Sequence, residues 1–522
     1  MKRNRLFTAI TLAAALAMTA CTQDELADNN MLPEGMYPLE IASVTLAVES
    51  SEQPWTRVRE NADGTGSTFF YGDTITVSLN GENATYTYNG STWTSDAPLY
   101  WRDTQMSTIT AWYASPEETD GTISLADQSS GLAYVLSGTG NGIYNTPVTL
   151  TFTHSLAKVQ VRFTGGNAHK VADVKIKSYT SCTHNQGTVS TEGASEGWIT
   201  MHKATYNDAT CWEANVVPGY QITKFKVNGT EGTLDNGGIT PEAGKLHKIT
   251  LSVKPITIED GNTISEPGDY ILTGTISQGV TLTNNDIRLT LKDVTSNISG
   301  SKSSTVTVNG CTPAIIIEGS NTLSSTGAYT GGINAINNGN IVIEGSGTLT
   351  INATGTENTA IGARRDGPYA CGNITIRGIT LNIENSAVGI GGAPNAGCGN
   401  ITIENATVNV AGGPAIGASN SGYTGVNTVC GDITITNTNL TATGNGSSVA
   451  IGCGNLSNGA GNTCGNITIV NTGKTESEIL STINGDSGAK KIGKGSGGTS
   501  TCGTVTITSS DGTSTYPDGV PD

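Results

Sequence analysis

The phrase CGNITI opens at Cys371 and again at Cys398, and close copies follow as CGDITI at Cys430, CGNITI at Cys464 and CGTVTI at Cys502. The starts of these copies are 27, 32, 34 and 38 residues apart. Self-similarity at a period of about 20–50 residues indicates a solenoid or another stacked array. We therefore expect the C-terminal half of the chain to consist of repeated coils.

One period contains three short segments with the pattern of strands. After Cys398 they are Asn400–Ile403, Thr407–Val410 and Ala415–Gly417, each alternating or β-branched and bounded by Gly, Asn or Pro. Such segments between turn residues indicate strands rather than helices. Because no helical stretch separates them, each period can close as one coil, and stacked coils pair as parallel strands about 4.8 Å apart. The pattern predicts a right-handed parallel β-helix.

The cysteine that opens each copy precedes a glycine at a corner of the predicted coil. Stacking places equivalent residues above one another, so we predict a structural ladder of buried thiols that act as small hydrophobic side chains. Disulfides or a metal site are the alternatives, although spacings of 27 or more residues do not resemble CxxC zinc ligands. Asn amides are expected to hydrogen-bond to each other along a second ladder. The predicted thiol ladder contains Cys371, Cys398, Cys430, Cys464 and Cys502.

Residues 1–20 have the organisation of a signal peptide. A basic start containing Lys2 and Arg3 precedes the apolar run Leu6–Met18, which has 13 residues. This run is too short to span a bilayer, which needs about 20 residues. We expect the chain to be exported.

The sequence around Cys21 resembles the lipobox of bacterial lipoproteins, in which this cysteine becomes the acylated N-terminus. Met18 stands where that family usually has Leu. Residues 22–25 (TQDE) resemble the acidic signal that sends some lipoproteins to the outer face of the outer membrane. The resemblance implies lipidation at Cys21 and an outer-membrane location facing the cell exterior. The alternative is a plain secretory signal with a chance cysteine.

Composition divides the mature chain. Residues 21–36 are acidic and lack periodicity, so we predict a tether. Residues 37–254 hold all six Trp and all five His and contain many short strand patterns, such as Thr108–Ala114 and Lys158–Phe163, separated by turns. Many short strands separated by turns predict β-sandwich structure. The β-helix is expected over residues 255–522, which makes the whole chain all-β.

Three segments of the sandwich region resemble the fimbrillin-like family of bacterial surface lipoproteins: Thr56–Gly81 (TRVRENADGTGSTFFYGDTITVSLNG), Pro98–Trp101 (PLYW) and Thr151–Phe163 (TFTHSLAKVQVRF). The resemblance implies two β-sandwich subdomains. The family includes fimbrial shaft and tip subunits. In polymerising members a protease cuts after an Arg so that a strand can be exchanged between subunits. The corresponding candidate for processing is Arg57; its alternative is an ordinary residue at the edge of the first strand.

The C-terminal region resembles the carbohydrate-binding β-helix domains of bacterial surface proteins, which share their fold with pectate lyases. A lyase would need clustered Asp or Glu for Ca²⁺ and a Lys or Arg base on adjacent coils. Apart from Glu384 against Glu357 and the pair Glu404 with Glu344, the acids between Gly331 and Val470 fall in different phases of the repeat, and the region contains no His. The sequence therefore predicts a non-catalytic protein without a metal or another cofactor.

The connections that follow the AIGA-type strands vary in length and chemistry while the strands stay constant. In solenoids such insertions gather on one face, often the binding face. Tyr rings can stack on sugars, and Asn and Arg can hydrogen-bond hydroxyls or carboxylates; ordinary solvated turns are the alternative. The candidate ligand-binding residues are Arg364, Arg365, Asp366, Tyr369, Asn395, Asn420, Tyr423, Asn427, Asn455 and Asn458.

Charge limits the partners. A formal net charge of −17 argues against nucleic acid, because phosphate binding needs a basic stripe. Three functions remain: a surface adhesin that binds a polysaccharide or host glycan, a fimbrial accessory or tip subunit that exchanges strands with other subunits, and, less favoured, a polysaccharide lyase or hydrolase. Cys182 and Cys211 are expected to form a disulfide or to remain two free thiols.

Overall fold

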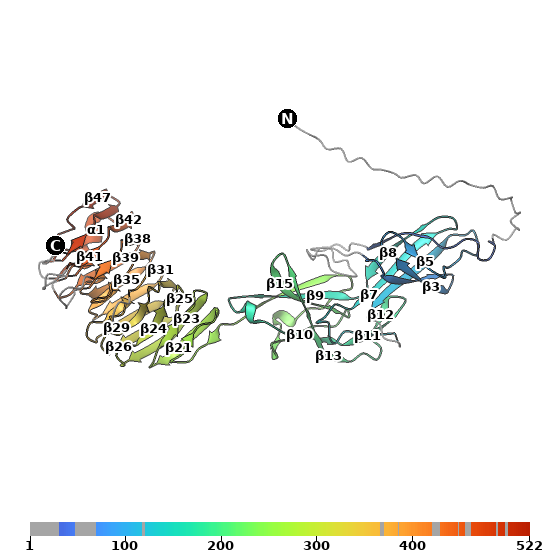
Figure 1. Cartoon of the computed structure of the whole chain (residues 1–522), viewed down its shortest axis with the longest axis horizontal. Coiled ribbons are helices and arrows are strands. Elements are labelled where there is room, and N and C mark those ends of the chain that lie inside the picture. The colour runs from blue at the N-terminus through green and yellow to red at the C-terminus, as the bar shows by residue number, and fades with distance from the viewer. Residues whose placement is uncertain are drawn as a thin grey trace, which may run out of the picture. The chain divides into compact units, whose positions relative to one another are not determined.

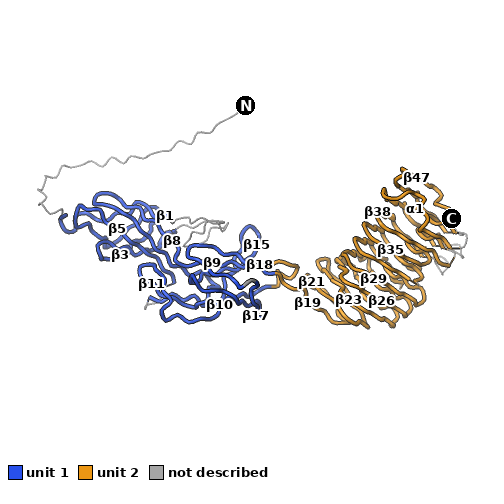
Figure 2. The backbone as a smooth tube through the Cα atoms, turned by 180° about the vertical axis from the view of Figure 1, so that it is seen from behind, with its two compact units in different colours: residues 1–162, 171–251 blue, residues 163–170, 252–522 orange. Residues whose placement is uncertain are grey.

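The computed structural model of the chain describes residues 31–46, 69–116, 121–365, 370–384, 386–419, 428–446, 448–454, 461–486, 489–495 and 500–521. Nearly all regular structure in these residues is β-strand, which confirms the all-β class (Figure 1). The chain divides into two compact units (Figure 2). Unit 1 contains residues 1–162 and 171–251, and unit 2 contains residues 163–170 and 252–522. No helix within the described ranges is long and apolar enough to cross a membrane.

Unit 1 begins with a sheet of seven strands that closes on itself. The sheet closes through its first strand, β1 (Ile41–Leu46). This strand pairs antiparallel with the short β4 (Trp93–Thr94) on one side and parallel with β8 (Val148–His154) on the other, and Ile41 lies opposite both Trp93 and Val148. The aromatic residues Phe152, Trp101 and Tyr86 are buried inside it. The strands in order around the sheet are β1 (Ile41–Leu46), β4 (Trp93–Thr94), β3 (Glu82–Tyr88), β2 (Thr74–Leu79), β5 (Ser107–Ser115), β7 (Tyr134–Gly142) and β8 (Val148–His154).

The remainder of unit 1 consists of three antiparallel sheets. The first is β14 (His202–Tyr206), β15 (Ala209–Val216), β9 (Ala157–Thr164) and β18 (Leu246–Ser252). The second is β13 (Glu196–Thr200), β10 (Val174–Tyr179), β16 (Lys224–Val227) and β17 (Thr230–Thr233). The third is β12 (Thr188–Ser190), β11 (Ser181–Asn185) and β6 (Thr122–Ser124). The motif TFTHSLAKVQVRF, quoted above, forms β8 and β9 and therefore joins the closed sheet to the first of these sheets.

Unit 2 is a stack of coils. In one coil the chain forms β34 (Ile401–Glu404), β35 (Thr407–Gly412) and β36 (Ile416–Ala418), which confirms the three predicted strands to within about two residues. Each pairs in parallel with its equivalent in the next coil, namely β38 (Ile433–Thr436), β39 (Asn439–Gly444) and β40 (Ile451–Cys453). The first two strands of the coils make one 17-stranded sheet, and the third strands make a nine-stranded sheet.

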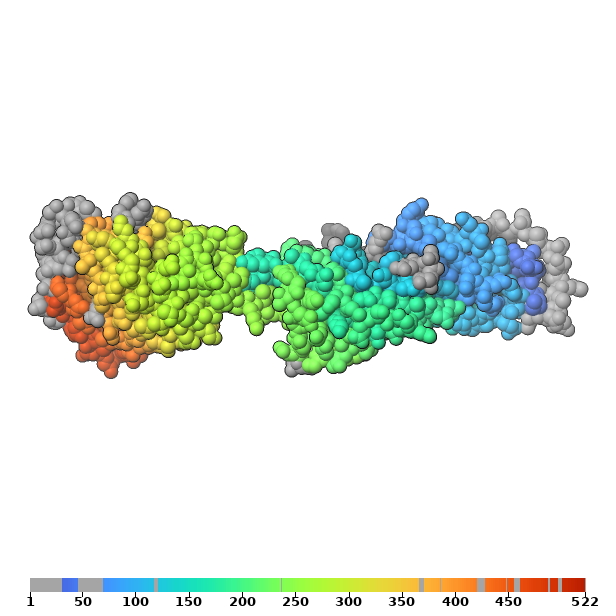
Figure 3. Space-filling view, turned by 90° about the horizontal axis from the view of Figure 1, so that it is seen from below, coloured from blue at the N-terminus to red at the C-terminus, as the bar shows by residue number. Residues whose placement is uncertain are grey.

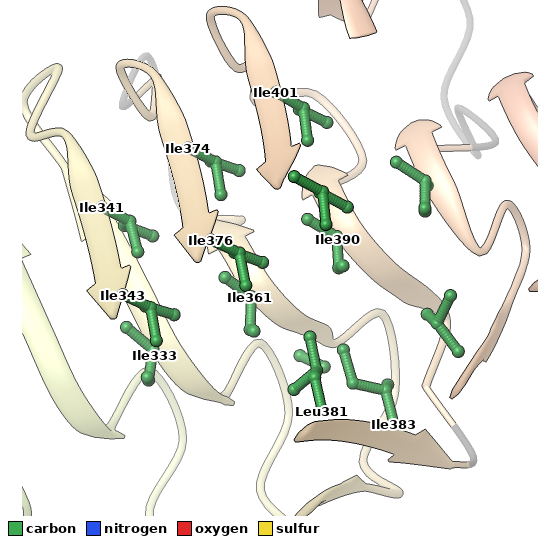
Figure 4. Packing of buried hydrophobic residues seen from close by; sticks show 14 of the residues in the cluster. Ile333, Ile341, Ile343, Ile361, Ile374, Ile376, Leu381, Ile383, Ile390 and Ile401 are labelled. Atoms are coloured by element: carbon green, nitrogen blue, oxygen red, sulfur yellow. The ribbon is translucent and has the colours of Figure 1, made fainter. Parts of the chain in front are cut away.

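The repeat phrase forms stacked strands with a fixed inside and outside. Ile341, Ile374 and Ile401 are register partners in successive coils, and all three are fully buried (Figure 4). The Thr between the two isoleucines points the other way, because side chains alternate across a strand, and Thr375 pairs with Thr402. Each I-T-I triplet therefore supplies two core side chains and one solvent-facing hydroxyl.

A column of glycines explains the second recurring phrase, AIGA. Gly362, Gly391, Gly417, Gly452 and Gly493 are register partners in the nine-stranded sheet. Their φ angles lie between +125° and +139°, a region that side chains disfavour. A Cβ atom at Gly417 would overlap the carbonyl oxygen of Gly452 in the next coil. Only glycine permits this close stacking.

The last coils contain two elements that the repeat pattern does not predict. A short helix, α1 (Glu476–Ser481), follows β42 (Ile467–Asn471), and its first turn is closed by a capping box between Thr475 and Glu478. The final strand β47 (Gly512–Tyr516) pairs antiparallel with β46 (Val505–Ser509). This reversal ends the series of parallel pairings in the 17-stranded sheet.

Candidate recognition edge of the coil stack

The repeat cysteines lie at the same corner of successive coils. Cys430, Cys464 and Cys502 are parallel register partners in the short strands β37 (Val429–Cys430), β41 (Thr463–Cys464) and β45 (Thr501–Cys502). In the coils before them, the backbone N–H of Gly399 donates to the carbonyl oxygen of Cys371 over 3.2 Å, and that of Gly431 donates to Gly399 over 3.0 Å. We call this series, from Cys371 through Cys398 to Cys502, the thiol row.

The thiol row is buried and its members contact one another. All five are free thiols, and only Cys502 is partly exposed. The thiols of Cys371, Cys464 and Cys502 donate to the carbonyl oxygens of Gly339, Gly431 and Gly465 over 3.8–3.9 Å. Interaction with the neighbouring Cys430, together with burial, raises the pKa of Cys398 and of Cys464. Burial raises the pKa of Cys371. No group of three or more His, Cys, Asp or Glu suited to a metal ion is found in the described part of the chain.

A second row explains why glycine and asparagine follow each cysteine. The side-chain Oδ1 of Asn373 accepts the backbone N–H of Asn400 over 2.9 Å, and Oδ1 of Asn400 accepts the N–H of Asp432 over 2.9 Å. The same bond recurs between Asn340 and Asn373, Asp432 and Asn466, and Asn466 and Thr504. A Cβ on the glycine of each phrase would overlap this Oδ1 atom.

The prediction that Asn amides bond to each other along this ladder was therefore wrong in its detail. Each side chain satisfies the main chain of the next coil, because the turn leaves that N–H group facing it. Amide-to-amide bonds occur elsewhere, between Asn409 and Asn382 over 2.9 Å and between Asn337 and Asn309 over 2.7 Å. The CGN phrase thus combines a buried thiol, room for an oxygen and a polar link between coils.

The variable connections all leave the stack from one column and return to another. They begin after the third strand of each coil, where Gly392, Ala418 and Cys453 are register partners. They end at the thiol row. Since both columns are continuous, the described ends of the connections at residues 364–370, 393–397, 419–429 and 454–463 lie along a single side of the stack. We call these four connections the recognition edge.

Two predicted ligand residues on this edge are held by the protein itself. Nη1 of Arg364 donates to the carbonyl oxygen of Lys302 over 2.7 Å. The guanidinium of Arg365 lies over the ring of Tyr329, 4.9 Å from its centroid, and forms an ion pair with Glu357. The Arg365 side chain is only 12% exposed. Both arginines therefore support the fold locally.

The other predicted ligand residues divide into one described residue and seven that are not. Asn395 lies in the turn of the shortest connection, and its buried Oδ1 has no hydrogen-bond partner among the described residues. Asp366, Tyr369, Asn420, Tyr423, Asn427, Asn455 and Asn458 lie outside the described residues. Cys21 and Arg57 also lie outside them.

The partners of Arg364 and Arg365 were not identified from the sequence. Lys302, Tyr329 and Glu357 each occupy a turn between the second and third strands of consecutive coils, and each has a positive φ between 56° and 65°. The sequence contains a weak sign of this equivalence, because each residue stands two places after a glycine, in GSK, GAY and GTE. Such a sign becomes visible only once the coils are aligned.

In unit 1, Cys182 and Cys211 are both buried free thiols, so the second of the two alternatives for this pair holds. Burial raises the pKa of Cys182 to about 11. Nearby in sequence to Cys211, a buried ion pair joins Nζ of Lys158 to Glu213 over 2.8 Å. Tyr206 donates to the same carboxylate over 2.8 Å. These groups satisfy one another inside the sandwich.

Comparison with known proteins concerns the first half of the chain. Residues 56–267 match the model of the family described as fimbrillin-like. No curated protein matches the sequence. Among solved structures, a candidate cell adhesion protein from Bacteroides uniformis is 22% identical, with 42% of this chain and 94% of that chain covered and a TM-score of 0.30.

Two further structures show a similar extent of likeness. A fimbrial protein from Bacteroides ovatus is 17% identical, with 41% of this chain and 50% of that chain covered and a TM-score of 0.24. The fimbrial anchor protein Mfa2 from Porphyromonas gingivalis is 13% identical, with 40% of this chain and 88% of that chain covered and a TM-score of 0.23.

Proposed function

We propose that the chain is a non-catalytic surface adhesin that binds a polysaccharide or host glycan through the recognition edge. The observation that carries the proposal is the contrast between the invariant rows of the coil stack and the unequal connections between them. Rows of Ile, Gly, Asn and Cys recur at equivalent positions and hold successive coils together. The lengths of the connections, in contrast, range from five residues at 393–397 to eleven at 419–429. Variation confined to one edge of a solenoid is typical of a binding surface.

We also infer that the stack is a right-handed parallel β-helix over residues 255–522. Its strands pair in parallel from coil to coil, and connections between parallel strands of one sheet are right-handed in about 98% of cases. The resemblance to carbohydrate-binding β-helix domains agrees with a glycan as the ligand. Fold alone does not assign function, so the connections have to be tested directly.

The attachment of this adhesin is part of the same proposal. A lipid on Cys21 anchors the chain to the outer membrane, facing the cell exterior, and residues 21–36 form the tether. The fimbrillin-like match over residues 56–267 supports a role at the cell surface. Metabolic labelling with a fatty acid, compared between the natural chain and Cys21→Ser, tests the anchor; incorporation independent of Cys21 overturns it.

The experiment that tests the function is a binding screen of residues 22–522 against a panel of polysaccharides and host glycans. We expect selective, saturable binding to one glycan class without release of shorter products. Absence of binding across the panel would contradict the recognition role. Release of unsaturated sugars from any polymer would instead identify a lyase.

A second candidate is a fimbrial accessory or tip subunit that assembles by strand exchange. The specific observation in its favour is that β1 lies before Arg57 in the chain and holds the closed sheet between β4 and β8. Cutting after Arg57 would permit β1 to leave and expose the edges of both neighbours. An arginine-specific protease should then produce oligomers from Arg59→Ala, which keeps Arg57, but not from the double variant Arg57→Ala, Arg59→Ala. A monomeric cut product excludes this function.

A further inference from the structure

Apolar side chains gather at the end of unit 1 where the described chain begins. Met31, Met36 and Met106 have exposures of 60%, 61% and 73%, and Tyr100 and Ile143 are also exposed. Monomeric soluble proteins rarely leave neighbouring large apolar side chains uncovered together. We call these five residues the apolar tip.

The members of the apolar tip come from three segments that the structure brings together. Met31 forms a β-bridge with Asp103, and Pro38 forms one with Tyr100. Between them, the N–H of Leu32 donates to the carbonyl oxygen of Arg102 over 2.7 Å. Residues 31–38 therefore run alongside residues 100–103 at one end of the closed sheet. Figure 3 shows residues 31–46, in the darkest blue, at an end of unit 1.

The third segment reaches the same end through the β5–β7 ladder. Ser107 pairs with Gly142, so the residues just outside this pair, Met106 and Ile143, leave the sheet together. The ring of Tyr144 packs edge-on against Tyr37, 5.4 Å between centroids, which ties this loop to residues 31–38. The three segments that hold the apolar tip thus meet at one end of the closed sheet.

A second exposed apolar group lies at the opposite end of the sheet. Tyr71 is 81% exposed and precedes β2, whose Thr76 pairs with Trp112 near the far end of β5. Tyr71 therefore lies away from Ser107, where β5 begins. This residue provides a matched control on the same sheet.

We propose that the apolar tip rests on the lipid surface of the membrane to which the chain is anchored. This inference depends on the proposed lipid anchor, because Met31 lies only ten positions after Cys21. A chain of that length spans at most about 36 Å. The anchor therefore keeps the apolar tip near the bilayer, whereas Tyr71 lies at the other end of the sheet.

The chemistry of the apolar tip suits the interfacial region of a bilayer. Methionine is flexible and apolar, and tyrosine combines an apolar ring with a polar hydroxyl that remains hydrated. The charged residues beside it are Glu34 and Asp103, together with an ion pair between Arg102 and Glu82. Since Glu34 and Asp103 carry negative charge, the apolar tip should prefer neutral zwitterionic headgroups to anionic ones.

The test places an environment-sensitive fluorophore on Met106→Cys or, as control, on Tyr71→Cys. The acylated protein is reconstituted in phosphatidylcholine vesicles that contain a spin-labelled lipid. Unsubstituted protein corrects for labelling of its natural thiols, most of which are buried. We expect a blue-shifted emission and several-fold stronger quenching at position 106 than at position 71, and no shift at either position without vesicles.

A second arm separates this inference from the anchor itself. A histidine tag before Thr22 attaches the unacylated chain to nickel-chelating lipid at nearly the same point. If labels at both positions stay equally hydrated on vesicles that carry the protein, the inference is wrong, and this outcome does not bear on acylation of Cys21. A shielded label at position 106 without vesicles would show that a second copy covers the apolar tip, which also overturns the inference.

Discussion

At the scale of single residues, the glycine of each AIGA-type phrase is required by the neighbouring coil. Gly417 has a φ of +134°, and a side chain there would meet the backbone of Gly452. We expect Gly417→Ala to lower the free energy of unfolding of unit 2 by roughly 1–3 kcal/mol or more, because the backbone must move to admit a methyl group. Guanidinium unfolding followed by circular dichroism measures this change.

The matched control is Gly473→Ala in the same unit. Gly473 has no positive φ, and the nearest atom to a new Cβ is Oδ1 of Asn471 at 3.5 Å, an ordinary contact. This variant should change the free energy of unfolding by less than about 1 kcal/mol. Equal effects of the two substitutions would mean that the glycine row is not constrained by stacking.

The pH dependence of unit 1 should depend on His154. Burial and the charge of Lys158 lower the pKa of His154 from 6.5 to about 3. Below pH 6.5 the imidazole of His154 is therefore protonated in the unfolded state, whereas in the folded state it stays neutral down to about pH 3. Stability contributed by the neutral imidazole is present above pH 6.5 and is lost as the pH falls, by at most about 1.4 kcal/mol per pH unit from this one group.

Tryptophan fluorescence isolates this effect, because all six Trp lie within residues 37–254. Denaturant unfolding between pH 4 and pH 7, about the range of the expected effect, should show a steeper loss of stability for the natural chain than for His154→Gln. The difference between the two chains removes the contribution of other titrating groups. Parallel pH profiles would contradict the assigned environment of His154.

At the scale of elements, the repeated strands were predictable because their information is local. Alternating Ile and Thr between turn residues such as Gly and Asn specify β34 and its equivalents, and the same side chains face the core in every coil. The asparagine bonds were not predictable in detail, since the choice between an amide and a backbone partner depends on turn geometry. Helix α1 was not predicted, although Thr475-x-x-Glu478 fits a capping box. The repeat pattern around it indicates strands alone.

The closed sheet of unit 1 shows the opposite situation. Strands such as β5 and β9 are recognisable from alternation, and their predicted bounds differ from the observed bounds by about one residue. The parallel pairing of β1 with β8 has no local signal, because about a hundred residues separate the partners and nothing in either strand specifies the other. Closure therefore had to come from the structure.

The thiol row gives a prediction for these stacked elements. In the folded chain a thiol reagent should modify at most Cys502 within minutes, because the other members are buried and their reaction requires opening of the stack. Denaturation should expose all nine described cysteines. Mass spectrometry of the modified peptides measures both states. Rapid modification of Cys398 or Cys430 in the folded chain would contradict the proposed packing of this corner.

At the scale of the whole molecule, the position of the recognition edge was predictable from the sequence, but the protein partners of its side chains were not. The edge follows from connections that interrupt a constant repeat, which is visible in the letters alone. That Arg365 is bound to Glu357 and Tyr329 is not visible, because Tyr329 belongs to the preceding coil and Glu357 to a different turn of the same coil. Of the described candidates, Asn395 keeps an unpaired buried oxygen, whereas Arg364 and Arg365 already have protein partners.

The most direct measurement of the central claim is glycan binding by a connection-exchange variant. Residues 419–429 are replaced by the five-residue sequence of 393–397, which joins the same two columns of the stack. Circular dichroism verifies that the coils remain folded. The account predicts that the connection-exchange variant loses the glycan binding of the natural chain. The control substitution Thr402→Ser, at a solvent-facing position of a repeat strand, should leave glycan binding unchanged. Binding of equal affinity by the exchanged and natural chains would contradict a recognition edge.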